Sequence, residues 1–185
     1  MKLSLLLLSL CAACAQASTE DLNIAADRNA AIAAARAIIS QDPFVNLVTV
    51  DRNGQPRVRT MEHSGADDNM VIYLATIPTT RKLNQIKANP QVTLLFDNPG
   101  ETAFVTLMGT ATVHTDPHTV RQHAWQSDAS LAQFYPNFPQ DYVLIAVKPR
   151  WLEVLSPTIQ ARDADWRPQA VVFPQSPSHQ SPPNQ

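Results

Sequence analysis

Six short segments rich in β-branched and other apolar residues follow one another between residues 44 and 155, and they restrict the fold more than any other feature. The predicted strands cover residues 44–50, 55–64, 70–75, 91–96, 103–115 and 142–155, the last interrupted near Pro149. Asn53-Gly54 is a strong signal for a hairpin between the first two strands. Strands at this spacing, joined mostly by tight turns, predict a mainly β fold: a six-stranded antiparallel barrel with a few short helices.

The connection between the third and fourth strands carries the most unusual local pattern. Pro78 and the threonines beside it suit a turn and a helix N-cap, and Asn89-Pro90 ends a short helix. Arg81 and Lys82 then fall in the first turn, where the helix dipole disfavours each cation by about 0.3–1 kcal/mol. A bound anion would reverse this cost, because free N–H groups, hydroxyls and cations form a phosphate cradle. The alternative is a solvated charged turn.

Two further cations are predicted to share one face of a strand. Arg57 and Arg59 lie two residues apart in the second strand, and alternate strand residues point to the same side. Such charges can simply protect an edge strand from pairing with another chain. If they lie beside Arg81 and Lys82, four cations surround one turn, which suits a dianionic phosphate group.

Charge and motif content exclude several classes of function. A formal net charge of −2 gives no bulk attraction for nucleic acid. His114, His118 and His123 straddle Asp116-Pro117 and share no regular helix face, so we expect no metal site. A haem ligand supplied by one of these histidines is the alternative. Neither a Ser–His–Asp order nor paired carboxylates can be recognised, so we assign no catalytic residue and expect chemistry from a bound cofactor.

Residues 1–17 have the pattern of a secretory signal peptide. Lys2 precedes an apolar stretch at residues 3–13, and Ala-Gln-Ala at residues 15–17 predicts cleavage before Ser18. We therefore expect an exported protein, located in the bacterial periplasm. An imperfect lipid-attachment box at Cys14 leaves a lipoprotein as the alternative, and without lipidation we expect no membrane association.

The rest of the chain divides into three parts. Residues 18–42 are alanine-rich and predict an N-terminal helix capped by Asp21 or Asn23, and residues 43–156 form the barrel domain. Residues 157–185 form a proline-rich tail that we expect to be largely disordered. Within this tail, the apolar side chains of residues 166–173 could still dock onto the domain.

A set of ordered segments resembles the pyridoxamine 5′-phosphate oxidase-like, FMN-binding split-barrel family, and within it the general stress protein branch. The matching segments are residues 47–51, 54–61, 73–76, 80–82, 88–92 and 109–111, together with Trp125. They extend over nearly the whole predicted domain. One departure is Leu155, which occupies a position where the family often has an aromatic residue.

The resemblance implies a Greek-key split barrel that forms a homodimer and binds FMN at the subunit interface. The cofactor-binding set that it implies is Arg59, Thr60, Met61, Ala75, Thr76, Thr80, Arg81, Lys82 and Trp125. In the family, the arginine matching Arg59 and the pair matching Arg81 and Lys82 hold the phosphate. The tryptophan matching Trp125 approaches the flavin from the partner subunit.

Two functions follow as hypotheses. The first is an exported flavoprotein that carries out FMN-dependent redox chemistry on a small molecule. The second is a non-catalytic binding protein, in which the same barrel carries flavin or haem or serves as an envelope stress protein. Absorption spectra of the purified protein distinguish flavin bands from a haem Soret band.

Overall fold

The computed structural model describes residues 23–159 and 167–175, so the predicted signal peptide lies outside the described residues. In chain order the elements are α1 (Arg28–Ile39), β1 (Phe44–Val50), β2 (Pro56–Ala66), β3 (Ile72–Thr76), α2 (Arg81–Ala88), β4 (Gln91–Asn98), η2 (Pro99–Glu101), β5 (Ala103–His114), α3 (Pro117–His123), α4 (Asp128–Phe134), β6 (Val143–Leu155) and β7 (Gln169–Val172). None of the helices in these residues is long and apolar enough to cross a membrane.

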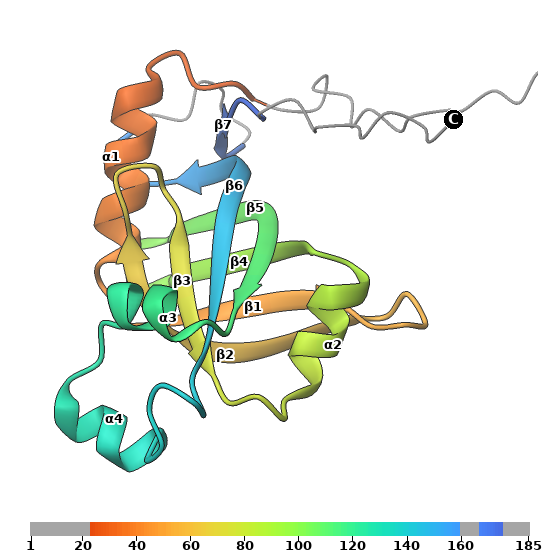
Figure 1. Cartoon of the computed structure of the whole chain (residues 1–185). Helices are drawn as coiled ribbons and strands as arrows, with labels where there is room; N and C mark the ends of the chain where they lie inside the picture. The colour runs from red at the N-terminus through yellow and green to blue at the C-terminus, as the bar shows by residue number, and fades with distance from the viewer. Residues whose placement is uncertain (1–22, 160–166, 176–185) are drawn as a thin grey trace, which may run out of the picture.

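Six antiparallel strands close into a barrel, as the sequence predicts (Figure 1). They pair in the order β3-β2-β1-β4-β5-β6, and β6 pairs in turn with β3. The connection after β3 carries α2, as expected, and the connection after β5 carries α3 and α4. Since β3 and β4 are separated in the sheet by β2 and β1, the connection that contains α2 must pass over one end of the barrel.

The barrel interior is filled by alternate residues of each strand. In β1, Val45, Leu47 and Thr49 are buried while their neighbours are partly exposed, and β4 buries Leu94 and Phe96 in the same way. Full burial of one such aliphatic or aromatic side chain stabilises the fold by about 1.5–3 kcal/mol. The period-two pattern therefore fixes which face of each strand lines the core and which faces outward.

Strand β6 is continuous where the sequence predicted an interruption at Pro149. Residues 144–149 and 151–155 of β6 pair with β5, and the register shifts between Met108 and Gly109, opposite the proline. A Cβ atom at residue 109 would lie 2.4 Å from the carbonyl oxygen of Lys148. Glycine at this position therefore permits the close backbone approach that carries the strand past Pro149.

Helix α1 is shorter than predicted and begins at Arg28. The predicted cap Asp21 lies outside the described residues, and the predicted cap Asn23 is replaced by Asp27, whose Oδ1 accepts from the N–H groups of Asn29 and Ala30 at 2.9 and 3.0 Å. The physical reason is that the chain before Asp27 is extended: Ile24 forms a parallel β-bridge with Ala170.

Part of the proline-rich tail packs on the domain, as its apolar segment led us to expect. Residues 169–172 form β7, which pairs with residues 151–154 of β6, and residues beyond 175 lie outside the described part. Ala170 and Val171 are 1% and 2% exposed, so burial of apolar side chains supplies the driving force. On its other edge β7 binds the N-terminal segment, since Ala170 donates to the Asn23 carbonyl at 2.7 Å.

Helices α3 and α4 cover the outer wall of β3 and β6 with a second apolar cluster. The sequence Asp116-Pro117 predicts a helix that is capped by Asp116 and runs to about residue 127. Asp116 does cap α3, by accepting from the Thr119 N–H at 2.8 Å, but α3 ends at His123. A second cap, Ser127, starts α4. The buried residues of this cluster are Ala75, Val120, Tyr142 and Leu144, with Trp125 and four other aromatic side chains packed against them: Tyr73, Tyr135 and Phe138, and His123, which stacks on Tyr73.

A buried histidine ties β2 to the chain before β1. His63 is 6% exposed, and its Nδ1 accepts from the Gly65 N–H at 2.9 Å. Its proton is therefore on Nε2, which lies 2.9 Å from the Asp42 carbonyl oxygen. Burial lowers the pKa of His63 below its usual 6.5, and this outweighs the opposing effects of Asp42 and Glu62. The neutral ring is thus part of the folded structure.

We expect this histidine to make the protein less stable in mild acid. The unfolded chain takes up a proton on this residue near pH 6.5, while folded His63 takes it up only at lower pH. The contribution of neutral His63 to the free energy of unfolding is therefore fully present above pH 6.5, and it is lost as the pH falls through the lower folded pKa. Urea unfolding from about pH 8 to about pH 5 measures this loss. His63→Gln should lose less stability over the same range. Equal slopes for both proteins would contradict the assignment.

Candidate cofactor site

The β1–β2 hairpin brings Arg57 and Arg59 to the end of the barrel. Gly54 adopts a φ of 78° and donates from its N–H to the Asp51 carbonyl at 2.9 Å, which confirms the predicted turn. Arg57 then folds back on the turn, with its Nε and Nη2 both 2.9 Å from Asp51 Oδ2. The charge of Arg57 is therefore balanced within the hairpin, while Arg59 points along the same face without a carboxylate.

Helix α2 begins with an unused cap. Thr80 occupies the N-cap position with extended backbone, but its hydroxyl makes no capping hydrogen bond to the first turn. That hydroxyl lies 3.3 Å from Thr76 Oγ1, which in turn accepts from Lys82 Nζ at 2.9 Å. No acidic residue stands in the first turn. The N–H groups of the first turn, beside Arg81 and Lys82, thus receive no side-chain acceptor from the cap residue.

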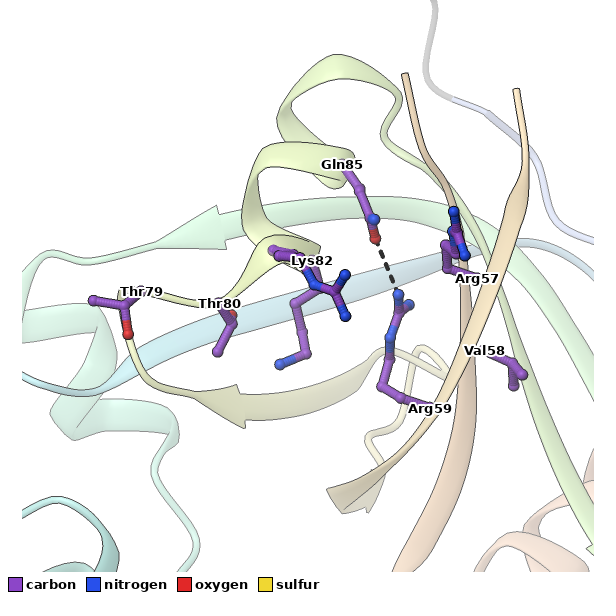
Figure 2. Close-up of a pocket in the computed structure, with 8 residues that line it drawn as sticks. Arg57, Val58, Arg59, Thr79, Thr80, Lys82 and Gln85 are labelled. Atoms are coloured by element: carbon purple, nitrogen blue, oxygen red, sulfur yellow. Dashed lines mark hydrogen bonds between the residues drawn. The ribbon is translucent and has the colours of Figure 1, made fainter. Parts of the chain in front are cut away.

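A pocket of about 570 Å³ lies between this helix start and β2 (Figure 2). Lys82 enters it from α2 and Arg59 from the barrel wall. The complete lining is Arg57, Val58, Arg59, Thr79, Thr80, Arg81, Lys82 and Gln85. Four of these eight residues are cations, as the sequence led us to expect if the strand and helix cations lie together.

Electrostatics in the pocket are unbalanced. Burial lowers the pKa of Arg59, and the nearby charge of Arg81 lowers it further. Burial likewise lowers the pKa of Lys82, followed by the effect of Arg59. Within the described residues the single ion pair is that of Arg57 with Asp51, so these three cations face one another without a counter-ion from the chain. An anion placed among them would relieve the repulsion.

The structure brings together only part of the set implied by resemblance. Arg59, Thr80, Arg81 and Lys82 line the pocket, and Thr76 joins them through its contact with Lys82.

The other four lie elsewhere. Thr60 is on the outer face of β2, where its hydroxyl donates to Asn46 Oδ1 at 3.3 Å, and Met61 is in the barrel core. Ala75 and Trp125 pack together in the second cluster, outside the pocket lining. The indole Nε1 of Trp125 is buried without a hydrogen-bond partner in the described structure.

Sequence reasoning missed two residues that hold Arg59. Gln85 Oε1 accepts from Arg59 Nη2 at 3.0 Å, and Thr49 Oγ1 accepts from Nη1 at 2.7 Å. Their positions carried a usable signal. Thr49 is a polar residue at an inward position of an apolar strand, and Gln85 stands one helical turn after Arg81.

Comparison with known proteins decides the family. The family model for pyridoxamine 5′-phosphate oxidase matches residues 31–156, which include every strand of the barrel. The chain belongs to the pyridoxamine 5′-phosphate oxidase family. Comparison with curated proteins found no match.

Solved structures of similar fold include proteins of different cofactor chemistry. A protein from Clostridium acetobutylicum related to general stress protein 26 is 19% identical, with a TM-score of 0.61 over 72% of this chain and 92% of that one. An FMN-binding protein from Nostoc punctiforme is 19% identical, with a TM-score of 0.58 over 82% and 98%. A heme-binding protein from Mycobacterium smegmatis is 16% identical, with a TM-score of 0.58 over 77% and 57%. These likenesses establish the shared fold.

We expect inorganic phosphate to stabilise the protein through the pocket. Phosphate bound only by the folded state would add about 1.4 kcal/mol to the free energy of unfolding at roughly ten times its Kd. Thermal unfolding in phosphate and in chloride at equal ionic strength separates this effect from screening. The difference should vanish in Arg59→Ala and persist in Arg52→Ala, which removes an exposed cation from the hairpin turn.

Proposed function

We propose that the protein binds FMN and uses it for redox chemistry on a small molecule. The observation that carries the proposal is the group of three cations, Arg59, Arg81 and Lys82, around one pocket without a carboxylate among them. A phosphate monoester dianion is the ligand group that such a cluster at a helix N-terminus binds best. Membership of a family whose solved neighbours include an FMN-binding protein supports flavin as the rest of the ligand.

The residues present fit this cofactor. Lys82 and Arg59 would contact phosphate oxygens directly, while the Thr80 hydroxyl, which does not cap the helix, and the first N–H groups of α2 would complete the cradle. Outside the pocket lining, the buried Nε1 of Trp125 is a further donor without a partner in the described residues. Bound FMN supplies the electron-accepting chemistry, and the chain's own residues position it.

The pocket favours flavin over haem. Haem iron in proteins is held by histidine, cysteine, methionine or tyrosine. None of the eight lining residues is of these types. His123, on α3, is stacked on Tyr73 with ring centroids 4.4 Å apart, and it does not line this pocket. A haem carrier, the second candidate suggested by one structural neighbour, would therefore need an axial ligand from outside this lining.

We also propose that the functional unit is a homodimer that buries the outer wall of the barrel. Strand register aligns one outward residue from each of five strands in a row: Val58, Val48, Thr93, Met108 and Trp151. Four of the five are apolar, and Val58 is 67% exposed. Val58 also lines the cation pocket, so a second subunit on this row would border the cofactor.

Export is the third part of the proposal, and it rests on the predicted signal peptide. The mature chain would then begin at Ser18 and would bind its flavin in the periplasm. If Cys14 is lipidated instead, the mature chain would begin at Cys14 and would bind flavin at the membrane surface. Mass spectrometry of the protein from its native compartment distinguishes these two outcomes by the N-terminal residue and by the mass of an attached lipid.

Replacing Arg81 and Lys82 together by alanine should abolish flavin retention and leave the fold intact. Each lost charge-assisted contact weakens binding, so we expect the Kd for FMN to rise by at least about 100-fold. The readouts are flavin absorption after gel filtration and the unfolding midpoint. Arg52→Ala with Lys87→Ala is the matched control, because it removes two exposed cations outside the pocket lining. Normal flavin retention in the Arg81/Lys82 variant would refute the cradle.

Met108→Glu should convert the dimer to a monomer. A carboxylate in the middle of the apolar row would be buried without a partner on association, which costs several kcal/mol. Sedimentation velocity gives the mass of each variant. Thr112→Glu, four residues further along the outer face of β5 and exposed, is the control and should stay dimeric. An unchanged mass for Met108→Glu would place the interface elsewhere.

A further inference from the structure

Arg59 is held by two different elements through neutral groups alone. Its Nη1 donates to the Leu47 carbonyl at 3.2 Å and to Thr49 Oγ1 at 2.7 Å, both on β1. Its Nη2 donates to Gln85 Oε1 on α2 at 3.0 Å (Figure 2). Thr49 and Gln85 are also joined to each other, because Thr49 Oγ1 donates to Gln85 Oε1 at 2.6 Å. We call these two side chains the neutral bracket.

Hydrogen-bond chemistry fixes the orientation of the bracket. A guanidinium group can only donate, so the Gln85 atom that faces Arg59 must be its oxygen. Thr49 accepts from Arg59 and has a single proton left, which goes to the same oxygen. Within the described residues the Gln85 amide nitrogen has no hydrogen-bond partner, although Gln85 lines the pocket. Thr49 is fully buried, so water does not compete for the bonds of its hydroxyl.

The bracket holds Arg59 without cancelling its charge. The neighbouring Arg57 shows the opposite arrangement, since Asp51 both orients it and neutralises it at 2.9 Å. A carboxylate in place of Gln85 would orient Arg59 equally well but would remove the attraction for an anionic ligand. Neutral acceptors are therefore the expected partners of a cation whose charge attracts an anionic ligand.

We propose that Thr49 and Gln85 are positioning residues that present Arg59 to the phosphate end of the ligand, and so set the preference for a phosphorylated flavin over riboflavin. This inference rests on the proposed function. It concerns the phosphate end alone, because neither residue is needed to contact the ring of the ligand.

The test compares the Kd of FMN with that of riboflavin by flavin fluorescence quenching. Gln85→Ala and Thr49→Val should weaken FMN about tenfold and leave riboflavin unchanged. Gln85→Glu should also weaken FMN, although it keeps both acceptor positions. Thr49→Ser, unlike Thr49→Val, keeps the hydroxyl and should bind FMN with wild-type affinity. Asn84→Ala, one residue earlier on the exposed face of α2, is the matched control and should bind FMN normally.

Outcomes separate this inference from the flavin proposal. An FMN-to-riboflavin ratio that stays at the wild-type value in Gln85→Ala and Thr49→Val overturns the positioning role, as does an equal loss for both ligands. Thermal stabilisation by inorganic phosphate is the second measurement, and it should fall in Gln85→Ala. If wild-type protein binds neither flavin but its response to phosphate still depends on Gln85, the bracket stands and the flavin proposal fails. A phosphate response independent of Gln85 overturns the bracket.

Discussion

Closure of the barrel by pairing of β3 with β6 determines where every other part of the structure lies. Because β6 bonds to both β5 and β3, the sheet has no free edge there, and β3 ends on the opposite side of β2 and β1 from β4. The connection from β3 to β4 must then cross the barrel mouth, and this crossing places the start of α2 above Arg59. The pocket is thus a consequence of strand order, and no residue within α2 could create it alone.

Much of the fold was accessible from local sequence. The Asn53-Gly54 turn, the alternation of apolar residues and the Asp116 cap each depend on neighbours within a few positions, and each was found where expected. The start of α1 was not accessible. It depends on a contact between Ile24 and Ala170, which are 146 positions apart in the chain, and local sequence patterns carry no signal for such pairing.

The candidate site divides in the same way. The cations of α2 were visible because they violate the preference of a helix N-terminus. The signal from Thr49 and Gln85 is weaker: one is a polar residue at an inward strand position and the other stands one helical turn after Arg81, but neither residue type is unusual in its element. Their role arises only when the register of β1 with β2 and the crossing of α2 bring both to Arg59. Resemblance supplied Thr60, Met61 and Trp125, which lie outside the pocket lining in a single chain.

The placement of β7 also affects the order in which the sheet can form. This strand lies between β6 and the segment at residues 23–25, so segments near the two ends of the described chain complete one sheet together. During synthesis the N-terminal segment has no partner until residue 172 has left the ribosome. Completion of this sheet is therefore a late step in folding, because it needs a contact between residues that are 146 positions apart in the chain.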